Sequence, residues 1–371
     1  MKQKILNHLK NLRGWKTNRK IVVIAVDDYG NVRLDSKEAF ERMSAQGLKV
    51  QSRFDVFDSL ETKEDLEMLY EALSSVKDKN GNHAVFTPFA LSCNINFEKM
   101  AAEKYEVFSN EILPVTYEKL SQQQPKAYEG TWQLWKEGID KGFMKPQFHG
   151  REHLNLKVFN TKISKRDSDI LIALKNRSFS SISAADFPTI NYTAAFDFWD
   201  PIENENLFEI VKDGVKLFED VYGYKAIHFM PPTSKISDAI LDKLGELNLK
   251  FVDRGLIHKQ HQGFGQYKTT YNYTGKKGNN NTTFLVRNVV FEPTENTKAT
   301  ELALQSIEAA FSLNKPAIIS SHRVNFSGNI EPFNRKQGIE SLRLLLKKIV
   351  EKWPEVEFMS SAELCNEIVK C

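Results

Sequence analysis

Short apolar segments alternate with longer amphipathic segments along most of this chain of 371 residues. The short segments, rich in β-branched and aromatic residues, are 21–26, 83–89, 144–148, 226–229, 250–253, 285–291 and 317–320. The longer segments, with apolar residues at helical spacing, are 35–46, 132–141, 207–222, 236–247, 300–313 and 338–353. Strands that alternate with helices in this way are typical of β/α units, which build a parallel sheet covered by helices. The alternation therefore predicts an α/β fold, either a β/α barrel or a wound sheet.

The chain shows no internal repeat, no low-complexity linker and no sharp change in composition, which favours one domain over two. Hydrophobic residues make up 41% and charged residues 27%, close to ordinary globular usage, which argues against a disordered chain. We expect an amphipathic helix in residues 1–20 and one barrel domain in residues 21–371, with an insert at about 94–141.

Charge and cysteine content exclude several classes of function. A net charge of +3 with both signs interspersed implies no nucleic-acid partner. The three cysteines, Cys93, Cys365 and Cys371, are too few and too scattered for a disulfide framework or a cysteine-based zinc site. No stretch approaches the roughly 20 apolar residues of a membrane span, so we expect no transmembrane segment. Without a secretory signal, a reducing, cytoplasmic location is expected, and the oligomeric state is left open.

The N-terminal segment has apolar residues at helical intervals, namely Ile5, Leu6, Leu9 and Leu12, among several basic residues. This spacing predicts a short amphipathic helix, not a signal peptide. Packing of the helix on the fold is the favoured interpretation, and weak contact with a membrane surface is the alternative.

Two adjacent carboxylates, Asp27 and Asp28, follow the first apolar segment, just before Gly30. Active sites of β/α folds collect at the carboxyl ends of the strands. Adjacent carboxylates repel each other, so they need a metal, a base or a shared proton to lie together. Neighbouring strand residues point to opposite faces, but a chain that turns at Gly30 would bring both to one pocket. A solvated turn is the alternative.

Two histidines, His149 and His153, follow another apolar segment at a spacing of four. If a helical turn starts here, both imidazoles lie on one face, an arrangement that suits one divalent ion. Two histidines and a carboxylate leave coordination positions open for water and substrate, as catalytic sites require. Exposed histidines at a helix start are the alternative.

His322 ends the last apolar segment. A single histidine in this place is more often structural. The fold, however, would gather His322, the Asp27–Asp28 pair and the two earlier histidines on one rim, because all follow strand-like segments. Together they favour a metal-dependent hydrolase.

At these residues the chain resembles the NodB-like polysaccharide deacetylases of the glycoside hydrolase/deacetylase β/α-barrel superfamily. The family's Thr-Phe-Asp-Asp-Gly block is similar to residues 25–30, its His-Ser/Thr-x-x-His block to 149–153, and its Leu-x-His block to 320–322. The Asp-Asp-aromatic-Gly variant also resembles related chitooligosaccharide deacetylases. The resemblance implies a single distorted (β/α) barrel of seven strands.

The resemblance also implies roles for the five residues. Asp28, His149 and His153 would hold one divalent metal ion, Asp27 would be the base and His322 the acid. Zinc is the first expectation for the ion, although two histidines and an aspartate also accept Co²⁺, Ni²⁺ or Fe²⁺. The implied reaction is removal of an acetyl group from an N- or O-acetylated sugar or polysaccharide precursor. Trp132 and Trp135 of the insert would stack on sugar rings, or else pack the insert onto the barrel.

One departure from the family pattern bears on catalysis. Met230 stands where the family's Arg-Pro-Pro block has the arginine that orients the base. Arg254, Arg287 or Arg323 would have to replace it. Two other functions remain open: a catalytically inactive carbohydrate-binding barrel, and a metal-dependent glycosidase on the same scaffold.

Overall fold

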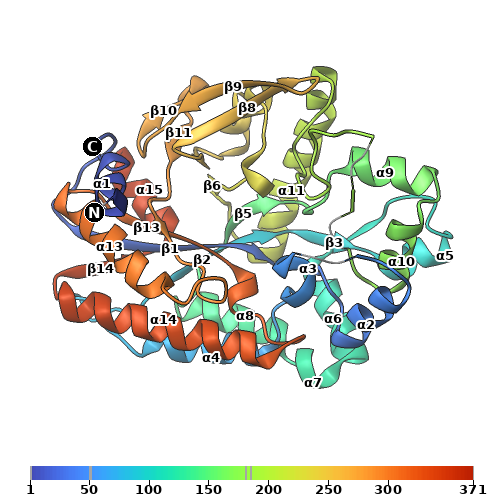
Figure 1. Cartoon of the computed structure of the whole chain (residues 1–371), viewed down its shortest axis with the longest axis horizontal. Coiled ribbons are helices and arrows are strands. Elements are labelled where there is room, and N and C mark those ends of the chain that lie inside the picture. Colours follow the sequence, from blue (N-terminus) through green and yellow to red (C-terminus); the bar gives the residue numbers. More distant parts are fainter. Residues whose placement is uncertain (1, 50–51, 180–181, 184–185, 371) are drawn as a thin grey trace.

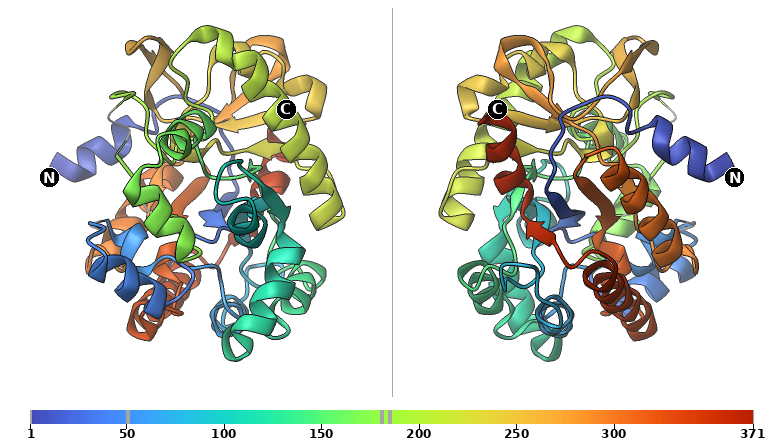
Figure 2. Two further views of the ribbon diagram at one scale, coloured as in Figure 1. Left: turned by 90° about the vertical axis from the view of Figure 1, so that its right-hand side faces the viewer. Right: turned by 90° about the vertical axis from the view of Figure 1, so that its left-hand side faces the viewer.

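A curled sheet forms the centre of the molecule and helices cover its outer face (Figure 1, Figure 2). The computed structural model describes residues 2–49, 52–179, 182–183 and 186–370. The strands of this sheet are β1 (Lys20–Tyr29), β2 (Phe86–Leu91), β5 (Gln147–Gly150), β6 (His228–Phe229), β7 (Phe251–Asp253), β10 (Lys276–Lys277), β11 (Thr283–Leu285), β12 (Val289–Val290), β13 (Ala317–His322) and β14 (Val356–Met359).

The strands follow one another around a barrel. From β1 the parallel pairing runs through β2, β5, β6 and β7 to β11 in one direction, and through β13 to β12 in the other. Residues 286–288 join β11 directly to β12, so the chain itself bridges the seam between the two ends. The predicted distorted (β/α) barrel is confirmed.

The sheet has ten strands by hydrogen bonding among the described residues, against the seven expected. The difference arises from short additions. β11 and β12 act as one strand interrupted at residues 286–288, β10 pairs antiparallel with β11, and β14 pairs with the first half of β1. Seven parallel strands remain once the interrupted strand is counted once.

Helices surround the sheet. They are α1 (Lys2–Leu9), α2 (Lys37–Ala45), α3 (Arg53–Phe57), α4 (Lys63–Ser74), α5 (Phe97–Ala102), α6 (Leu113–Gln123), α7 (Pro125–Tyr128), α8 (Thr131–Asp140), α9 (Leu156–Ser164), α10 (Ser168–Lys175), α11 (Asn204–Tyr222), α12 (Asp238–Leu241), α13 (Ala299–Ser312), α14 (Pro332–Lys352) and α15 (Ser361–Val369). No helix in the described part of the chain is long and apolar enough to span a bilayer.

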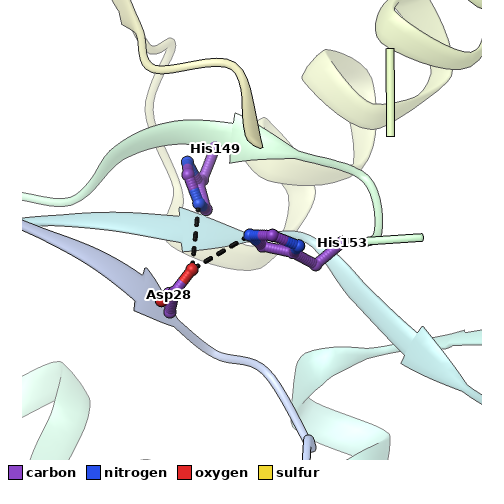
Figure 3. Close-up of side chains that lie close together, drawn as sticks. All are labelled: Asp28, His149 and His153. Carbon is purple, nitrogen blue, oxygen red and sulfur yellow. Dashed lines mark hydrogen bonds and ion pairs between the residues drawn. The ribbon is translucent and has the colours of Figure 1, made fainter. Parts of the chain in front are cut away.

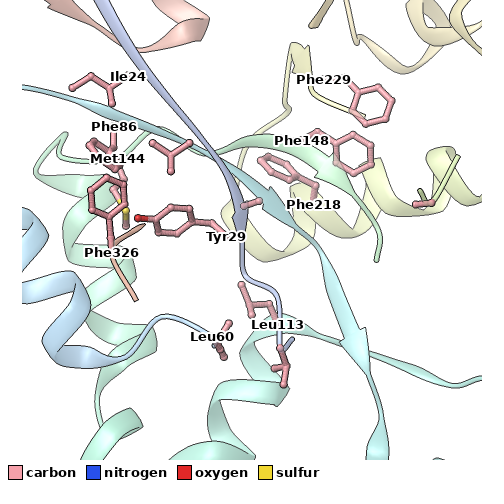
Figure 4. Close-up of a cluster of buried hydrophobic side chains, with 14 of the residues drawn as sticks. Ile24, Tyr29, Leu60, Phe86, Leu113, Met144, Phe148, Phe218, Phe229 and Phe326 are labelled. Carbon is pink, nitrogen blue, oxygen red and sulfur yellow. The ribbon is translucent and has the colours of Figure 1, made fainter. Parts of the chain in front are cut away.

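β1 is buried on both faces, and its alternate residues enter two separate apolar clusters. Ile21 and Val23 pack with residues of β7, β11 and β13 and with α15. Val22, Ile24 and Val26 belong to the larger cluster between the sheet and the helices, part of which Figure 4 shows. With a two-residue period, Asp27 continues the series of Ile21 and Val23. Its carboxylate is therefore directed toward the inside of the barrel.

The insert at about 94–141 holds α5 to α8 and the short strand pair β3 (Cys93–Ile95) and β4 (Asn110–Ile112). Trp135 is fully buried, and its indole Nε1 donates hydrogen bonds to Glu61 (3.1 Å) and to the Tyr117 hydroxyl (3.0 Å). Trp132 stacks on Tyr117. Of the two interpretations of these tryptophans, the structure favours packing of the insert onto the barrel.

The structure differs from the predicted pattern in several places, for example by the unpredicted helices α4, α9 and α10. The segment 236–247 forms α12 and a separate 3₁₀ turn, η3 (Leu244–Leu247), in place of one helix. The hairpin of β8 (Ile257–Gly263) and β9 (Gln266–Tyr271) is not among the predicted elements. Its inward residues include the polar His258, Gln260 and His261, so no apolar alternation marks it.

Candidate active site

A pocket of about 430 Å³ lies at the carboxyl ends of the barrel strands. All five predicted site residues line it, together with other polar and aromatic side chains. The lining residues are Asp27, Asp28, Arg33, Ser52, Phe54, His149, His153, Asn191, Thr193, Met230, Thr233, Ser234 and His322. The strand polarity of a parallel barrel accounts for this convergence.

A bulge at the end of β1 turns two neighbouring carboxylates into the same pocket. The register between β1 and β2 shifts between Val26 and Tyr29, and Asp28 has a φ of 76°. A bulge redirects the side chain that would otherwise point to the opposite face of the sheet. A left-handed φ at a residue other than glycine costs energy and is commonest at functional sites. The local backbone thus accounts for Asp27 and Asp28 both lining the pocket.

Asp28, His149 and His153 form one buried group (Figure 3). Asp28 Oδ1 lies 3.3 Å from His149 Nε2 and 3.0 Å from His153 Nε2. One potential ligand atom from each residue lies within 4.8 Å of the others. No helix provides the four-residue spacing, because residues 151–154 form a loop that follows Gly150 at a φ of 129° and precedes α9. This loop brings the two rings together.

The surroundings of the three side chains leave their inward atoms available for a cation. His149 Nδ1 lies 2.6 Å from the carbonyl oxygen of Met230, to which it can donate. A ring that donates from Nδ1 has an unprotonated Nε2, which can then ligate a cation. Burial lowers the pKa of His153, which favours a neutral ring. Burial alone would raise the pKa of Asp28, but its contacts with His149 and His153 lower it well below the usual value. Two imidazoles and a carboxylate are one of the donor sets found in catalytic zinc sites.

Asp27 has different partners. The guanidinium of Arg287 binds it in a bidentate manner, with Nη1 at 2.9 Å from Oδ2 and Nη2 at 2.8 Å from Oδ1. Arg287 also donates to Oδ2 of Asp253 on β7, from Nε and Nη2. Arg287 lies in the 286–288 connection at the barrel seam, from which it reaches strands on both sides. A bidentate arginine fixes the orientation of a carboxylate as well as its charge.

The structure selects one of the three arginines proposed to replace the one missing at Met230. Arg287 contacts Asp27, whereas Arg254 binds Gln260 and His258, and Arg323 binds Asp58 and Glu61. Met230 supplies its backbone carbonyl to His149.

His322 lies on the other side of Asp27. Its Nε2 is 3.9 Å from Asp27 Oδ2, and its Nδ1 is 2.7 Å from Oε1 of Glu292. Burial would lower the pKa of His322, but the hydrogen bond and charge of Glu292, with help from Asp28 and Asp27, raise it to about 9. A pKa in this range favours the protonated ring at neutral pH, with Nε2 on the side of Asp27.

Two carboxylates that hold the predicted site residues in place were absent from the predicted set. Glu292 orients His322, and Asp253 shares Arg287 with Asp27. Both follow the rule that identified the other residues, because each is a carboxylate at the end of an apolar segment.

The chain matches no model of a known protein family and no curated protein. Among solved structures it is similar to a candidate polysaccharide deacetylase from Mycobacterium smegmatis, with 10% identity, coverage of 96% of this chain and 93% of that one, and a TM-score of 0.46. It is also similar to a candidate glycoside hydrolase/deacetylase from Parabacteroides distasonis, with 12% identity, 95% and 72% coverage, and a TM-score of 0.47.

A third similar structure is a 4-alpha-glucanotransferase from Thermococcus litoralis, with 11% identity and a TM-score of 0.46. The match covers 94% of this chain, which spans 40% of the length of the glucanotransferase.

Proposed function

We propose that this protein is a metal-dependent hydrolase that removes an acetyl group from an N- or O-acetylated sugar or polysaccharide precursor. One observation carries the proposal. A buried Asp-His-His group shares a pocket with a carboxylate held by arginine and with a histidine hydrogen-bonded to a glutamate. A cation site, a base and an acid are the three parts that hydrolysis of an acetyl group requires.

Asp28, His149 and His153 would hold the ion. Their ligand atoms are close together, and the other ring nitrogen of His149 is already engaged by Met230. His153 Nδ1 is buried and has no hydrogen-bond partner among the described residues. When bound there, Zn²⁺, Co²⁺, Ni²⁺ or Fe²⁺ supplies a Lewis acid for the acetyl carbonyl and lowers the pKa of water.

Asp27 would act as the base. Its carboxylate is buried, and Arg287 fixes both of its oxygens. In this orientation Asp27 accepts the proton of the attacking water, while the ligand role is left to Asp28. General-base catalysis of this kind typically contributes about 10² to 10⁴ in rate.

His322 would act as the acid. Its Nδ1 is committed to Glu292, so the proton that it can give is on Nε2, which lies on the Asp27 side of the ring. When His322 donates this proton to the leaving nitrogen or oxygen, the leaving group departs as a neutral molecule and not as an anion.

The remaining lining residues suit a hydroxylated substrate. Ser52, Asn191, Thr193 and Ser234 offer hydroxyl and amide groups, and Phe54 offers an aromatic face. Such a mixture of a few polar groups with an aromatic surface is common in pockets for sugars and other small ligands. The only carboxylates that line the pocket, among the residues described, are the adjacent Asp27 and Asp28. A glycosidase needs two carboxyl groups about 5 to 9 Å apart across the bond, which does not suit such neighbours.

The test measures acetate release from N-acetylated and O-acetylated sugar oligomers. Three samples are compared: the untreated protein, the protein treated with EDTA, and the treated protein after Zn²⁺ is added back. We expect release by the parent protein, loss on chelation and recovery with the metal. His149→Ala should stay inactive after metal addition, whereas His83→Ala, outside the pocket, should match the parent. Sugar binding without acetate release would indicate an inactive binding barrel, and new reducing ends would indicate a glycosidase.

A further inference from the structure

Helix α1 packs on the barrel with its polar face and exposes its apolar face. Asn7 and Asn11 are 2% and 3% exposed, and Asn11 accepts a hydrogen bond from Asn288 beside β12. The opposite side carries four large apolar residues that are 46 to 58% exposed, here called the apolar ridge: Ile5, Leu6, Leu9 and Leu12. Figure 2 shows α1 extending from the side of the molecule. An amphipathic helix of a globular protein normally buries its apolar face. In α1 the polar face is buried and the apolar face is exposed.

The charge of the chain is concentrated beside this ridge. Residues 1–20 contain seven of the 51 Lys and Arg and none of the 48 Asp and Glu. Residues 21–371 therefore carry 44 basic against 48 acidic residues, a formal charge of −4 against +7 for the first twenty. No ion pair of Lys4, Lys10, Arg13 or Lys16 is found within the described residues. The apolar ridge is thus bordered by cations that lack an anionic partner.

A pocket at the end of α1 is also lined by cations. Lys10, Arg13, Lys315 and Trp15 line it, and they are here called the basic pocket. Lys315 is 4% exposed and donates to the carbonyl oxygen of Gly14. Trp15 Nε1 is buried and has no hydrogen-bond partner in the described part of the chain. The described lining of this pocket thus contains three cations and an unused N–H donor but no carboxylate, a combination that favours an anionic ligand.

We propose that the apolar ridge and the basic pocket dock this protein on an anionic lipid surface. The helix and the turn that follows it lie in the plane of the interface, with Ile5 and Leu9 of the helix and Leu12 of the turn in the acyl boundary. Lys10 and Arg13, at the mouth of the basic pocket, pair with phosphate headgroups at the surface. This combination of an apolar face with flanking cations is the one that binds peripheral helices to anionic membranes.

The charge distribution argues against a second copy as the occupant. Two copies that met through the apolar ridge would bring two segments of +7 together, without a carboxylate in either. Such a contact is repulsive, whereas an anionic bilayer attracts the same segment. Proteins that expose a contiguous apolar patch usually bind something through it.

The experiment is co-sedimentation of the full chain with vesicles. One set contains phosphatidylcholine alone and the other contains phosphatidylcholine mixed with phosphatidylglycerol. We expect binding to the mixed vesicles at least about tenfold tighter than to the neutral ones, because each basic residue near the surface contributes about a fivefold gain. Salt at about 1 M should abolish most of the difference, because it shortens the Debye length to about 3 Å.

Variants separate the apolar and the basic contributions. The double change Leu9→Asp with Leu12→Asp should lower vesicle binding by at least about tenfold. Leu344→Asp, at a residue that is 45% exposed on α14, is the matched control and should bind as the parent does. Lys10→Gln and Arg13→Gln should each lower binding to the mixed vesicles by about fivefold, and Lys348→Gln should not. Thermal melting of each variant checks that the fold is kept.

Three results would overturn the proposal. They are absence of binding to the mixed vesicles, equal binding to the neutral vesicles, and full binding by the Leu9→Asp, Leu12→Asp variant. A dimer in sedimentation velocity that this variant abolishes would also overturn it, since the ridge would then serve a second copy.

Discussion

At the residue scale, Asp27 and Asp28 are neighbours in the chain with separate sets of partners. Asp27 binds Arg287, and Asp28 binds the two histidines. Asp27→Asn should therefore keep the metal and lower kcat by about 10² to 10⁴, because the amide cannot accept a proton. Asp28→Asn should first weaken metal affinity, and added metal should restore part of the activity. Metal titration beside acetate release measures both effects.

Three further outcomes complete this comparison. His322→Ala should resemble Asp27→Asn, with metal retained and turnover slowed. If Asp27→Asn loses the metal while Asp28→Asn keeps it, the two roles are exchanged. If all three variants lose the metal equally, the division between base and ligand is wrong.

Glu292 gives a prediction about pH at the same scale. His322 must carry a proton to act as an acid, and its pKa of about 9 means that activity declines as the pH rises through 9. Glu292→Gln removes the anion that opposes the effect of burial, so the pKa of His322 falls and the alkaline decline moves to lower pH. The profile of kcat against pH measures the shift.

The control for this prediction is Glu295→Gln. The Glu295 side chain is 61% exposed and pairs with Arg53 at 3.5 Å, so its loss should leave the alkaline limb in place. An alkaline limb that stays at the parent's pH in Glu292→Gln would show that His322 is not the titrating acid.

At the scale of elements, helix α14 approaches the turn that follows His322 more closely than any side chain would allow. A Cβ at Gly338 would lie 1.7 Å from the carbonyl oxygen of Asn325, in the 3₁₀ turn η5 (Arg323–Asn325). Gly338→Ala should lower the free energy of unfolding by about 1 to 3 kcal/mol or more through overpacking. Alanine's helix propensity, worth about 1 kcal/mol, does not offset this. Chemical denaturation measures the change.

Gly245→Ala is the matched control, since a Cβ there would lie 3.4 Å from the nearest atom, Asn280 O. This change should alter stability by less than about 1 kcal/mol. If the two substitutions change the free energy of unfolding equally, α14 can shift to make room for the new Cβ without strain. Its close approach would then not be needed to position the turn after His322.

At the scale of the whole molecule, strand polarity explains why so much of the pocket was predictable. Four of the five predicted site residues lie at or beside strand ends, namely Asp27, Asp28, His149 and His322. The fifth, His153, follows His149 by four residues. Parallel strands in a barrel all have their carboxyl ends at the same rim. A polar residue at the end of an apolar segment can therefore be assigned to that rim from the sequence alone. The barrel and the convergence of these five residues follow from this rule. The roles within the site, the extent of the domain and the cellular location stay predictions.

The partners of those residues were not predictable, because they depend on how distant segments meet. Arg287 reaches Asp27 across a separation of 260 residues, from the break between β11 and β12. The sequence of 285–291 reads as one continuous strand, and nothing in it marks the break that frees Arg287 to turn inward. The packing of helix α1 was not predictable for the same reason. Its periodicity indicates an apolar face, but it does not indicate which face packs against the barrel.

Metal binding should stabilise the whole molecule, because the Asp28, His149 and His153 group is buried and assembled only in the folded chain. A metal at 100 times its Kd adds about 2.7 kcal/mol to the free energy of unfolding, or a few degrees in Tm. EDTA should lower the Tm of the parent protein by that amount, and Zn²⁺ should restore it. In His153→Ala the Tm should no longer respond to EDTA, while in His83→Ala, away from the pocket, it should respond as in the parent. An EDTA-sensitive Tm that persists in His153→Ala would place the stabilising ion elsewhere in the molecule.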